Sequence, residues 1–133
     1  MSVNQADILK AAKTILLVDW PNPDVPRALL NAGFTVVGYS PGKYSAISQT
    51  DDGELVFSQL SKQPASVDIV NVYRPEAEHM AIINNHVLPL KAKVLWLHPP
   101  VKSAMTAAIA KEHRLIFIEG VDIAGVAKSI SDN

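Results

Sequence analysis

Five short runs of apolar, largely β-branched residues limit most strongly how this chain can fold. Segments with a helical spacing of apolar residues separate the runs, which occupy residues 14–18, 34–39, 67–73, 93–97 and 115–118. Most runs are almost continuously apolar, as expected for strands of a parallel sheet that helices cover on both faces. Two-residue turn signals for antiparallel hairpins are missing between neighbouring runs. The pattern therefore predicts an α/β fold with a doubly wound, five-stranded parallel sheet.

Helical patterns lie between these strands and at the two ends of the chain. The expected helices cover residues 7–12, 24–32, 75–88, 101–114 and 123–130. Asp24 can cap the second of these helices, and Gly33 follows it in the usual C-terminal position. Right-handed crossovers between the strands favour the order 3-2-1-4-5 in three α/β/α layers. Six strand residues are expected to be buried: Leu16, Val37, Ile69, Val70, Leu95 and Phe117.

Residues 40–63 carry the weakest pattern of the chain. This segment is rich in loop-forming residues around Asp51, Asp52 and Gly53, and one edge strand is expected at residues 54–57. Nothing here resembles a linker or a repeat. We therefore expect a single domain that spans residues 1–133.

Composition excludes several classes of function. The 133 residues are 48% hydrophobic and 19% charged, and the net charge of −1 provides no field that attracts nucleic acid or anionic lipid. The sequence contains no cysteine, which excludes disulfides and thiolate metal sites. No apolar stretch approaches the ~20 residues that cross a bilayer, and the first residues do not resemble a signal peptide. We expect a cytoplasmic protein without nucleic-acid or membrane partners.

Ligands of open α/β sheets bind beyond the carboxyl ends of the strands, so the residues after each strand are the candidates. The first strand is followed by Asp19, Trp20 and Pro21, a loop without glycine that carries acidic residues and prolines. Two interpretations remain open for this loop. It is either a binding loop altered for an unusual ligand, or a rigid turn in which Trp20 contributes packing.

Ser40, Pro41 and Lys43 follow the second strand, where a flexible turn and a cation can hold a ribose phosphate. An exposed turn with a solvated lysine would have the same sequence. Arg74 follows the third strand and can either bind an anion or form a salt bridge with Glu76 or Glu78.

His98 follows the fourth strand and is either a hydrogen-bonding structural residue or a general base. His79, His86 and His113 lie on expected helices without a ligand motif around them, so no metal is assigned. No nucleophile has a base placed beside it, which makes an enzyme the least favoured class.

Taken in order, several stretches resemble the CoA-binding domain family, a small Rossmann-like fold similar to the N-terminal domain of the succinyl-CoA synthetase α subunit. They are ILKAAKTI (8–15), PNPDVP (21–26), AGFTVVGYSP (32–41), VDIVNVYRPE (67–76) and AKVLWL (92–97). The resemblance implies CoA or a related adenine nucleotide across the strand ends, with phosphates on a glycine-containing loop after the first strand. Asp19 stands where the family usually has that glycine.

The resemblance gives Asp19 a specific role. We hypothesise that its carboxylate accepts the backbone N–H groups at the start of the following helix, where the family places pyrophosphate. Asp19 would then occupy the anion site from within and weaken the binding of CoA.

Two functions follow from these observations. The first is a non-catalytic protein that binds CoA or an adenine nucleotide with a degenerate phosphate loop. The second is an interaction or dimerisation domain that has lost nucleotide binding. A homodimer is expected in both cases, because the domain carries a large share of apolar residues for its size and stand-alone members of the resembling family dimerise.

Overall fold

The computed structural model describes residues 4–40 and 42–131 of the chain. Within them it has five α-helices and a seven-stranded mixed sheet in the order β4-β3-β2-β1-β5-β6-β7. The strands are β1 (Thr14–Val18), β2 (Thr35–Tyr39), β3 (Tyr44–Gln49), β4 (Leu55–Gln59), β5 (Ile69–Val72), β6 (Val94–Leu97) and β7 (Ile116–Ile118). None of the described helices is long and apolar enough to span a membrane.

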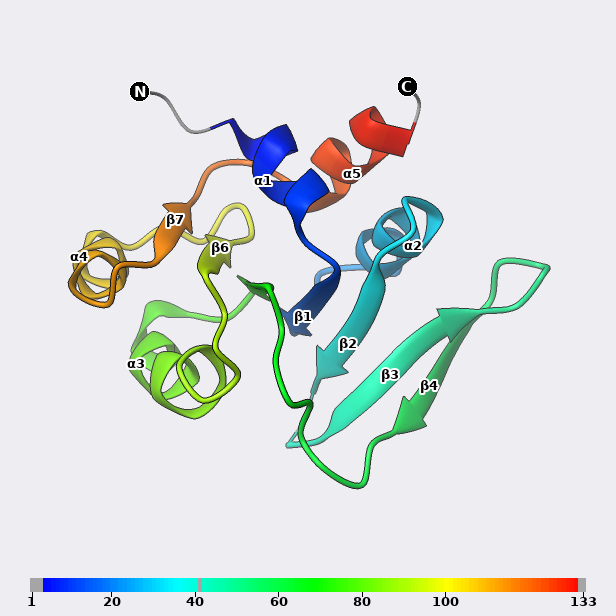
Figure 1. Cartoon of the computed structure of the whole chain (residues 1–133), viewed down its shortest axis with the longest axis horizontal. Coiled ribbons are helices and arrows are strands. Elements are labelled where there is room, and N and C mark those ends of the chain that lie inside the picture. Colours follow the sequence, from blue (N-terminus) through cyan, green and yellow to red (C-terminus); the bar gives the residue numbers. More distant parts are fainter. Residues whose placement is uncertain (1–3, 41, 132–133) are drawn as a thin grey trace.

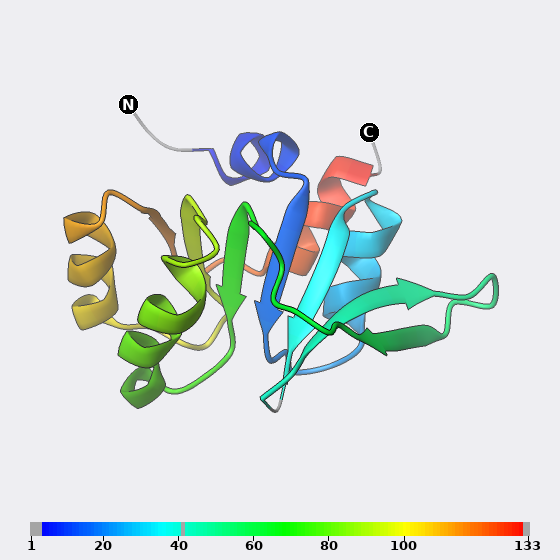
Figure 2. The same ribbon diagram turned by 60° about the horizontal axis from the view of Figure 1, so that its bottom comes forward.

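Helices cover both faces of the sheet and form three layers (Figures 1 and 2). One face packs against α1 (Gln5–Ala11), α2 (Asp24–Asn31) and α5 (Ile123–Ser131). The other face packs against α4 (Ala104–Glu112) and a helical segment made of η1 (Glu76–Glu78), α3 (His79–Ile82) and the π-helical η2 (Ile83–Val87). Burial on both faces explains why the central strands are apolar throughout.

The parallel core agrees with the sequence prediction in its strands but not in their order. The five predicted strands are β1, β2, β5, β6 and β7, and they pair in parallel. The predicted order 3-2-1-4-5 is wrong, because the third of these strands, β5, lies next to β1. The parallel part therefore has the order 2-1-3-4-5, another arrangement common in doubly wound sheets.

The cause of this difference is an antiparallel ribbon that the sequence prediction lacked. The predicted edge strand exists as β4, but it reaches the sheet through β3, which pairs with both β2 and β4. Because β3 occupies the outer edge of β2, the chain has to return to the free edge of β1 to add β5. Figure 2 shows the β3–β4 ribbon extending away from the helical layers.

Five of the six residues expected in the core are buried: Leu16, Val37, Ile69, Val70 and Leu95. The expectation for Phe117 is wrong, since its side chain is only half-buried. Phe117 lies on β7, the strand at the edge of the sheet, where neighbouring elements cover less of its surface.

Candidate functional site

The strand order defines one position where a ligand crevice is expected. The chain leaves β1 through α2 to β2 on one side, whereas β5 lies on the other side of β1. Crossovers that diverge in this way leave a crevice at the carboxyl ends of the two central strands. Asp19 directly follows β1, and Arg74 lies two residues beyond the end of β5. The switch point therefore brings together two of the residues that the sequence analysis selected.

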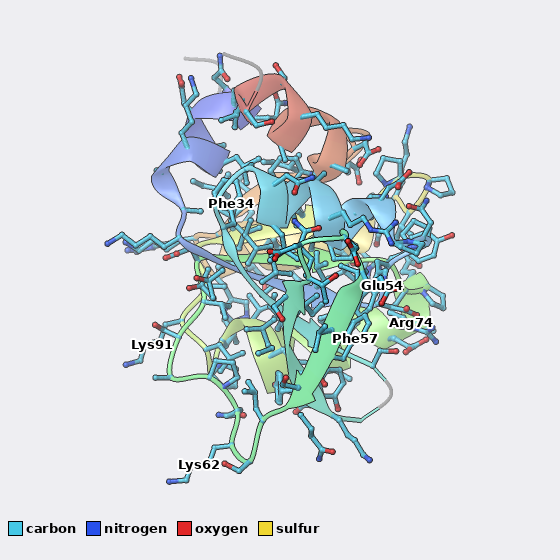
Figure 3. The ribbon with its side chains drawn as sticks, turned by 90° about the vertical axis from the view of Figure 1, so that its right-hand side faces the viewer. Phe34, Glu54, Phe57, Lys62, Arg74 and Lys91 are labelled. Atoms are coloured by element: carbon cyan, nitrogen blue, oxygen red, sulfur yellow. The ribbon has the colours of Figure 1, made fainter. Side chains whose placement is uncertain are left out.

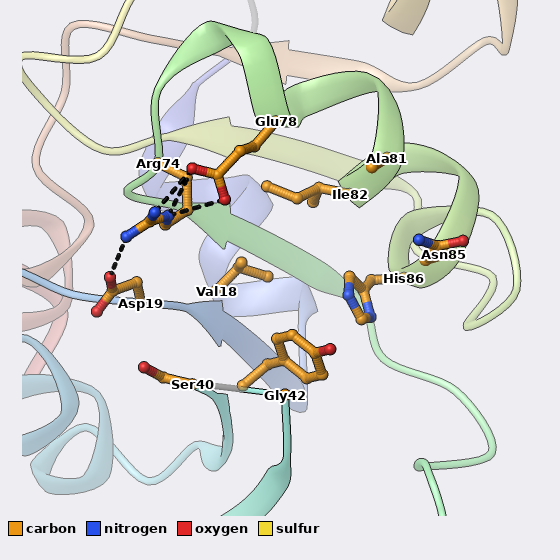
Figure 4. A pocket seen from close by; sticks show the side chains of 11 residues that line it. Val18, Asp19, Ser40, Gly42, Arg74, Glu78, Ala81, Ile82, Asn85 and His86 are labelled. Carbon is orange, nitrogen blue, oxygen red and sulfur yellow. Dashed lines mark hydrogen bonds and ion pairs between the residues drawn. The ribbon is translucent and has the colours of Figure 1, made fainter.

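An open pocket of about 380 Å³ begins at this switch point. It extends along the ends of β1 and β2 towards α3 and η2, and Figure 4 shows its side chains. The lining residues are Val18, Asp19, Tyr39, Ser40, Gly42, Arg74, Glu78, Ala81, Ile82, Asn85 and His86. The volume lies at the lower end of the range of small-molecule sites, roughly 300–1,000 Å³. A second hollow lies between α1 and the opposite ends of β5, β6 and β7, where open α/β sheets do not bind ligands.

Arg74 is held by two carboxylates at the mouth of the pocket. Its Nη1 lies 3.0 Å from Oδ2 of Asp19, while its Nε and Nη2 lie 3.1 and 2.7 Å from Oε1 and Oε2 of Glu78. The hydrogen bonds that Arg74 donates to Glu78 and Asp19 raise the pKa of Arg74, which stays a cation. The salt bridge that the sequence analysis left open is therefore present with Glu78, and Asp19 adds a second one across the switch point. This group of three carries one positive and two negative charges.

Asp19 has an unusual backbone conformation for a residue with a side chain. Its φ of 63° lies in the left-handed region, which glycine adopts freely and aspartate tolerates better than most residues. The resemblance described above implies a glycine at this position. The loop therefore keeps the backbone geometry of a glycine turn and adds a carboxylate to it.

The hypothesis that the Asp19 carboxylate accepts the backbone N–H groups at the start of α2 is wrong. Its Oδ1 accepts the N–H of Trp20 at 2.9 Å, and its Oδ2 faces Arg74. The side chain of Asn22 bonds the first amide of α2 instead, since its Oδ1 accepts the N–H of Asp24 at 3.0 Å. Asp24 itself begins the helix and does not cap it.

Tyr39 and His86 line the far end of the pocket, and Tyr44 contacts both of them from outside the lining. The ring centroids of Tyr39 and His86 lie 4.2 Å apart, and those of Tyr39 and Tyr44 lie 4.8 Å apart. The hydroxyl of Tyr44 is hydrogen-bonded to Nδ1 of His86. Burial lowers the pKa of His86, which favours the neutral ring at this position. The sequence predicts a helix at His86 but gives no sign of its contacts with Tyr39 and Tyr44, because the position of this helix relative to β2 and β3 is a tertiary feature.

Comparison with known proteins identifies the family. The sequence matches the family described as CoA binding domain over residues 18–122. The chain belongs to the CoA-binding domain family. The resemblance noted in the sequence is thus confirmed, and the matched region contains every lining residue of the switch-point pocket.

This CoA-binding domain has the same fold as several solved structures, although their sequence identity to it is low. A Thermus thermophilus protein, cell-free ID.343, is 21% identical with a TM-score of 0.67 and coverage of 93% of this chain and 94% of its own. Prb, a PH1109 protein redesigned for binding, is 19% identical with a TM-score of 0.70 and coverage of 96% and 90%. A hypothetical protein from Pyrococcus horikoshii OT3 is 17% identical with a TM-score of 0.67 and coverage of 93% and 87%. No curated protein matches significantly.

The other loop residues selected from the sequence of this CoA-binding domain lie around the pocket or away from it. Ser40 lines the pocket, and its N–H bonds the carbonyl of Lys43 at 3.1 Å, which closes the turn between β2 and β3. Lys43 is exposed on that turn, outside the described lining. Pro21 is exposed in the β1–α2 loop, and Pro41 lies outside the described residues.

Trp20 points to the opposite face of the sheet. Its ring stacks on Phe57 at 6.0 Å with an interplanar angle of 7°, and it packs against the backbone of Gly38. This position matches the packing interpretation of Trp20. The Trp20 side chain thus packs the loop that carries Asp19 against the β3–β4 ribbon.

His98 is buried and lies apart from the pocket. Its Nδ1 is 3.4 Å from Nδ2 of Asn71, and its Nε2 is 3.8 Å from Oδ1 of Asp122. Burial lowers the pKa of His98, although Asp122 opposes this effect. Oδ1 of Asn71 is buried and has no described hydrogen-bond partner. Among the residues of 4–40 and 42–131, no group of three metal-ligating side chains gathers here or elsewhere.

Proposed function

We propose that this protein binds CoA or a related adenine nucleotide, without catalysis, in the switch-point pocket. The position of Arg74 is the observation that carries the proposal. Its guanidinium lies at the mouth of the pocket between the ends of β1 and β5, where open α/β sheets bind their ligands. Guanidinium groups bind phosphates through paired, directional hydrogen bonds.

The pocket is suited to the adenosine-phosphate part of CoA. Arg74 lies at one end of the pocket, Ser40 and Gly42 lie at its rim, and Tyr39 lies at the far end. Phosphates placed between Arg74 and Lys43 would meet two cations, and an adenine ring would find an aromatic neighbour. The remainder of CoA extends beyond a pocket of this size into solvent along the strand ends.

In this proposal the Asp19 carboxylate lowers the affinity for the phosphates of the ligand. A phosphate that approaches Arg74 has to replace the Asp19 carboxylate, which lies 3.0 Å away. Two unit charges ~4 Å apart repel by about 4 kcal/mol at an effective dielectric of ~20, which corresponds to nearly three decades of affinity. The side chains of Arg74 and Asp19 are 40% and 32% exposed, so solvent and salt reduce this repulsion. Weak binding by the native protein follows.

A non-catalytic role agrees with the partners of the polar groups in the pocket. Asp19 and Glu78 are both paired with Arg74, and His86 is bonded to Tyr44. Among the described lining residues, no nucleophile lies beside a free general base.

Titration of CoA and ADP into the native protein and into Asp19→Asn tests the proposal. Asparagine keeps the left-handed backbone but removes the charge, so we expect affinity for CoA to rise at least tenfold. Asp24→Asn is the matched control, since Asp24 is exposed at the start of α2 and outside the pocket lining. Tight binding by the native protein with no gain in Asp19→Asn would contradict the role of Asp19.

The anion contacts are tested in the Asp19→Asn background. Lys43→Ala and Arg74→Ala should each weaken CoA binding by about 1.5–3 kcal/mol, the typical contribution of a hydrogen bond to a charged group. A thermal-shift series with CoA measures the same loss of affinity as a smaller stabilisation of each variant. A ligand at 100 times its Kd adds about 2.7 kcal/mol of stability.

An interaction domain without a nucleotide is the second candidate function. The pairing of Arg74 with two carboxylates favours it, since no charge of this residue is left uncompensated. Failure of CoA, acyl-CoA, ADP, ATP and NAD to bind both the native protein and Asp19→Asn would support this candidate.

A further inference from the structure

The outer edge of β4 is an unprotected edge of the sheet. β4 pairs with β3 on one side, and no strand of the described chain lies on its other side. Edge strands of natural proteins usually carry charges, prolines or bulges that prevent pairing with another chain. The sequence of β4, Leu-Val-Phe-Ser-Gln, contains no charge or proline. Val56 and Phe57 are 41% and 49% exposed, which places apolar side chains at this edge.

The hydrogen bonds to β3 determine which backbone groups are free. The N–H of Leu60 bonds the carbonyl of Tyr44, and the N–H of Thr50 bonds the carbonyl of Glu54. In an antiparallel ladder the groups of alternate residues point to opposite sides. Even-numbered residues of β4 therefore face β3, and Leu55, Phe57 and Gln59 direct their N–H and C=O groups outward.

We propose that this edge binds a second copy of the chain, so that two β4 strands pair antiparallel about a twofold axis at Phe57. Each outward residue then meets an outward residue of the copy, in the pairs Leu55–Gln59, Phe57–Phe57 and Gln59–Leu55. Each pair exchanges two backbone hydrogen bonds. Moving the axis to Val56 or Ser58 leaves only two such pairs within β4. The two seven-stranded sheets become one continuous sheet.

Charge at the ends of β4 fits the antiparallel direction. Asp51, Asp52 and Glu54 precede the strand, and Lys62 follows it; all four are exposed. Figure 3 shows Glu54 near one end of the strand and Lys62 beyond the other. In the proposed register Asp52 of one copy lies opposite Lys62 of the other, whereas parallel pairing would place the acidic ends side by side.

The aromatic residues fit the same axis. Phe57 meets its own copy across the two strands, and each Phe57 already stacks on Trp20 of its own chain. The dimer would thus contain a row of four rings on one face of the joined sheet, and cross-strand aromatic pairs stabilise sheets. The proposal does not depend on nucleotide binding, because β4 lies outside the pocket lining.

Sedimentation equilibrium across micromolar concentrations tests the proposal. The native protein should approach twice its 14.4 kDa mass. Phe57→Lys places two like charges opposite each other on the axis and should raise the dimer Kd at least tenfold. Ser48→Lys is the matched control, since Ser48 is exposed on β3 but not at the edge, and it should dimerise like the native protein. A native chain that stays monomeric at high micromolar concentration, or an equal loss in both variants, would overturn the proposal.

Two further measurements test the register. Asp52→Lys should weaken the dimer, and Asp52→Lys combined with Lys62→Asp should restore it. The chain has no cysteine, so Phe57→Cys can form a disulfide only with its copy. The expected Cα–Cα separation of ~5.5 Å suits a disulfide, and mild oxidation should give a covalent dimer that Ser48→Cys does not give. Failure of the double variant to recover, or crosslinking by Ser48→Cys alone, would exclude this register.

Discussion

Gly38 shows how one residue connects the sheet with the loop of the candidate site. A methyl group added at Gly38 would lie 2.9 Å from both Ile47 and Trp20, closer than side chains tolerate. The absence of a side chain thus allows the ring of Trp20 to approach β2 closely, next to the loop that begins with Asp19. Sequence alone placed Gly38 in a strand but indicated no neighbour for it.

Gly38→Ala should lower the free energy of unfolding by about 1–3 kcal/mol, the usual cost of overpacking. Gly125→Ala is the matched control. Gly125 lies within α5 with its nearest neighbouring atom at 3.9 Å, so alanine should raise stability by up to about 1 kcal/mol. Urea denaturation measures both changes. Equal stability of Gly38→Ala and the native protein would mean that Trp20 does not pack on this strand.

At the scale of elements, the start of α2 depends on a residue outside the helix. The Oδ1 of Asn22 accepts the N–H of Asp24, and its carbonyl lies 3.4 Å from the N–H of Val25. Because α2 has no other described side-chain cap, this residue satisfies a donor that the helix itself cannot.

Asn22→Ala should therefore destabilise the protein by about 1 kcal/mol, and Asn22→Asp should retain most of the native stability because aspartate also accepts this bond. Asn84→Ala serves as a comparison, since Asn84 is exposed on η2 with no described side-chain bond, and its effect should lie within about 0.5 kcal/mol. Chemical denaturation at pH 7 checks all three. A loss in Asn84→Ala as large as in Asn22→Ala would contradict the capping role.

At the scale of the whole molecule, two buried histidines on opposite faces of the sheet make stability depend on pH. Burial lowers the pKa of both His86 and His98; Tyr39 and Tyr44 surround the former, and Asp122 and Tyr73 lie near the latter. The unfolded chain, with a histidine pKa of ~6.5, then binds more protons than the folded chain in mildly acidic solution. The contribution of these two histidines to the free energy of unfolding is fully present above this pH. It is lost progressively as the pH falls below it.

Urea midpoints between pH 5.5 and 8 should rise with pH and level off above about 7.5. Each histidine contributes a slope of at most about 1.4 kcal/mol per pH unit. His86→Gln should reduce the slope, whereas His113→Gln, at an exposed position, should leave it unchanged. A slope that persists in full in His86→Gln would show that His86 is not one of the groups responsible.

The sequence by itself determined the parallel core, most of its helices and two central residues of the candidate site. Continuous apolar runs report burial on both faces, and Asp19 and Arg74 follow central strands whose ends meet at one edge of the sheet. Both signals are local, so periodicity and strand ends were sufficient to find them. Family membership followed from the same stretches.

Only the tertiary structure decided the strand order, the ribbon and the partners of the polar groups. Right-handed crossovers are compatible with either side of β1, and the choice depends on β3, whose mixed polar sequence does not indicate a buried strand. The Asp19–Arg74 pair joins residues 55 positions apart, and the bond between Tyr44 and His86 spans 42 positions. Periodicity describes which face of an element is buried, whereas these contacts depend on which elements become neighbours, and that choice is made by packing of the whole sheet.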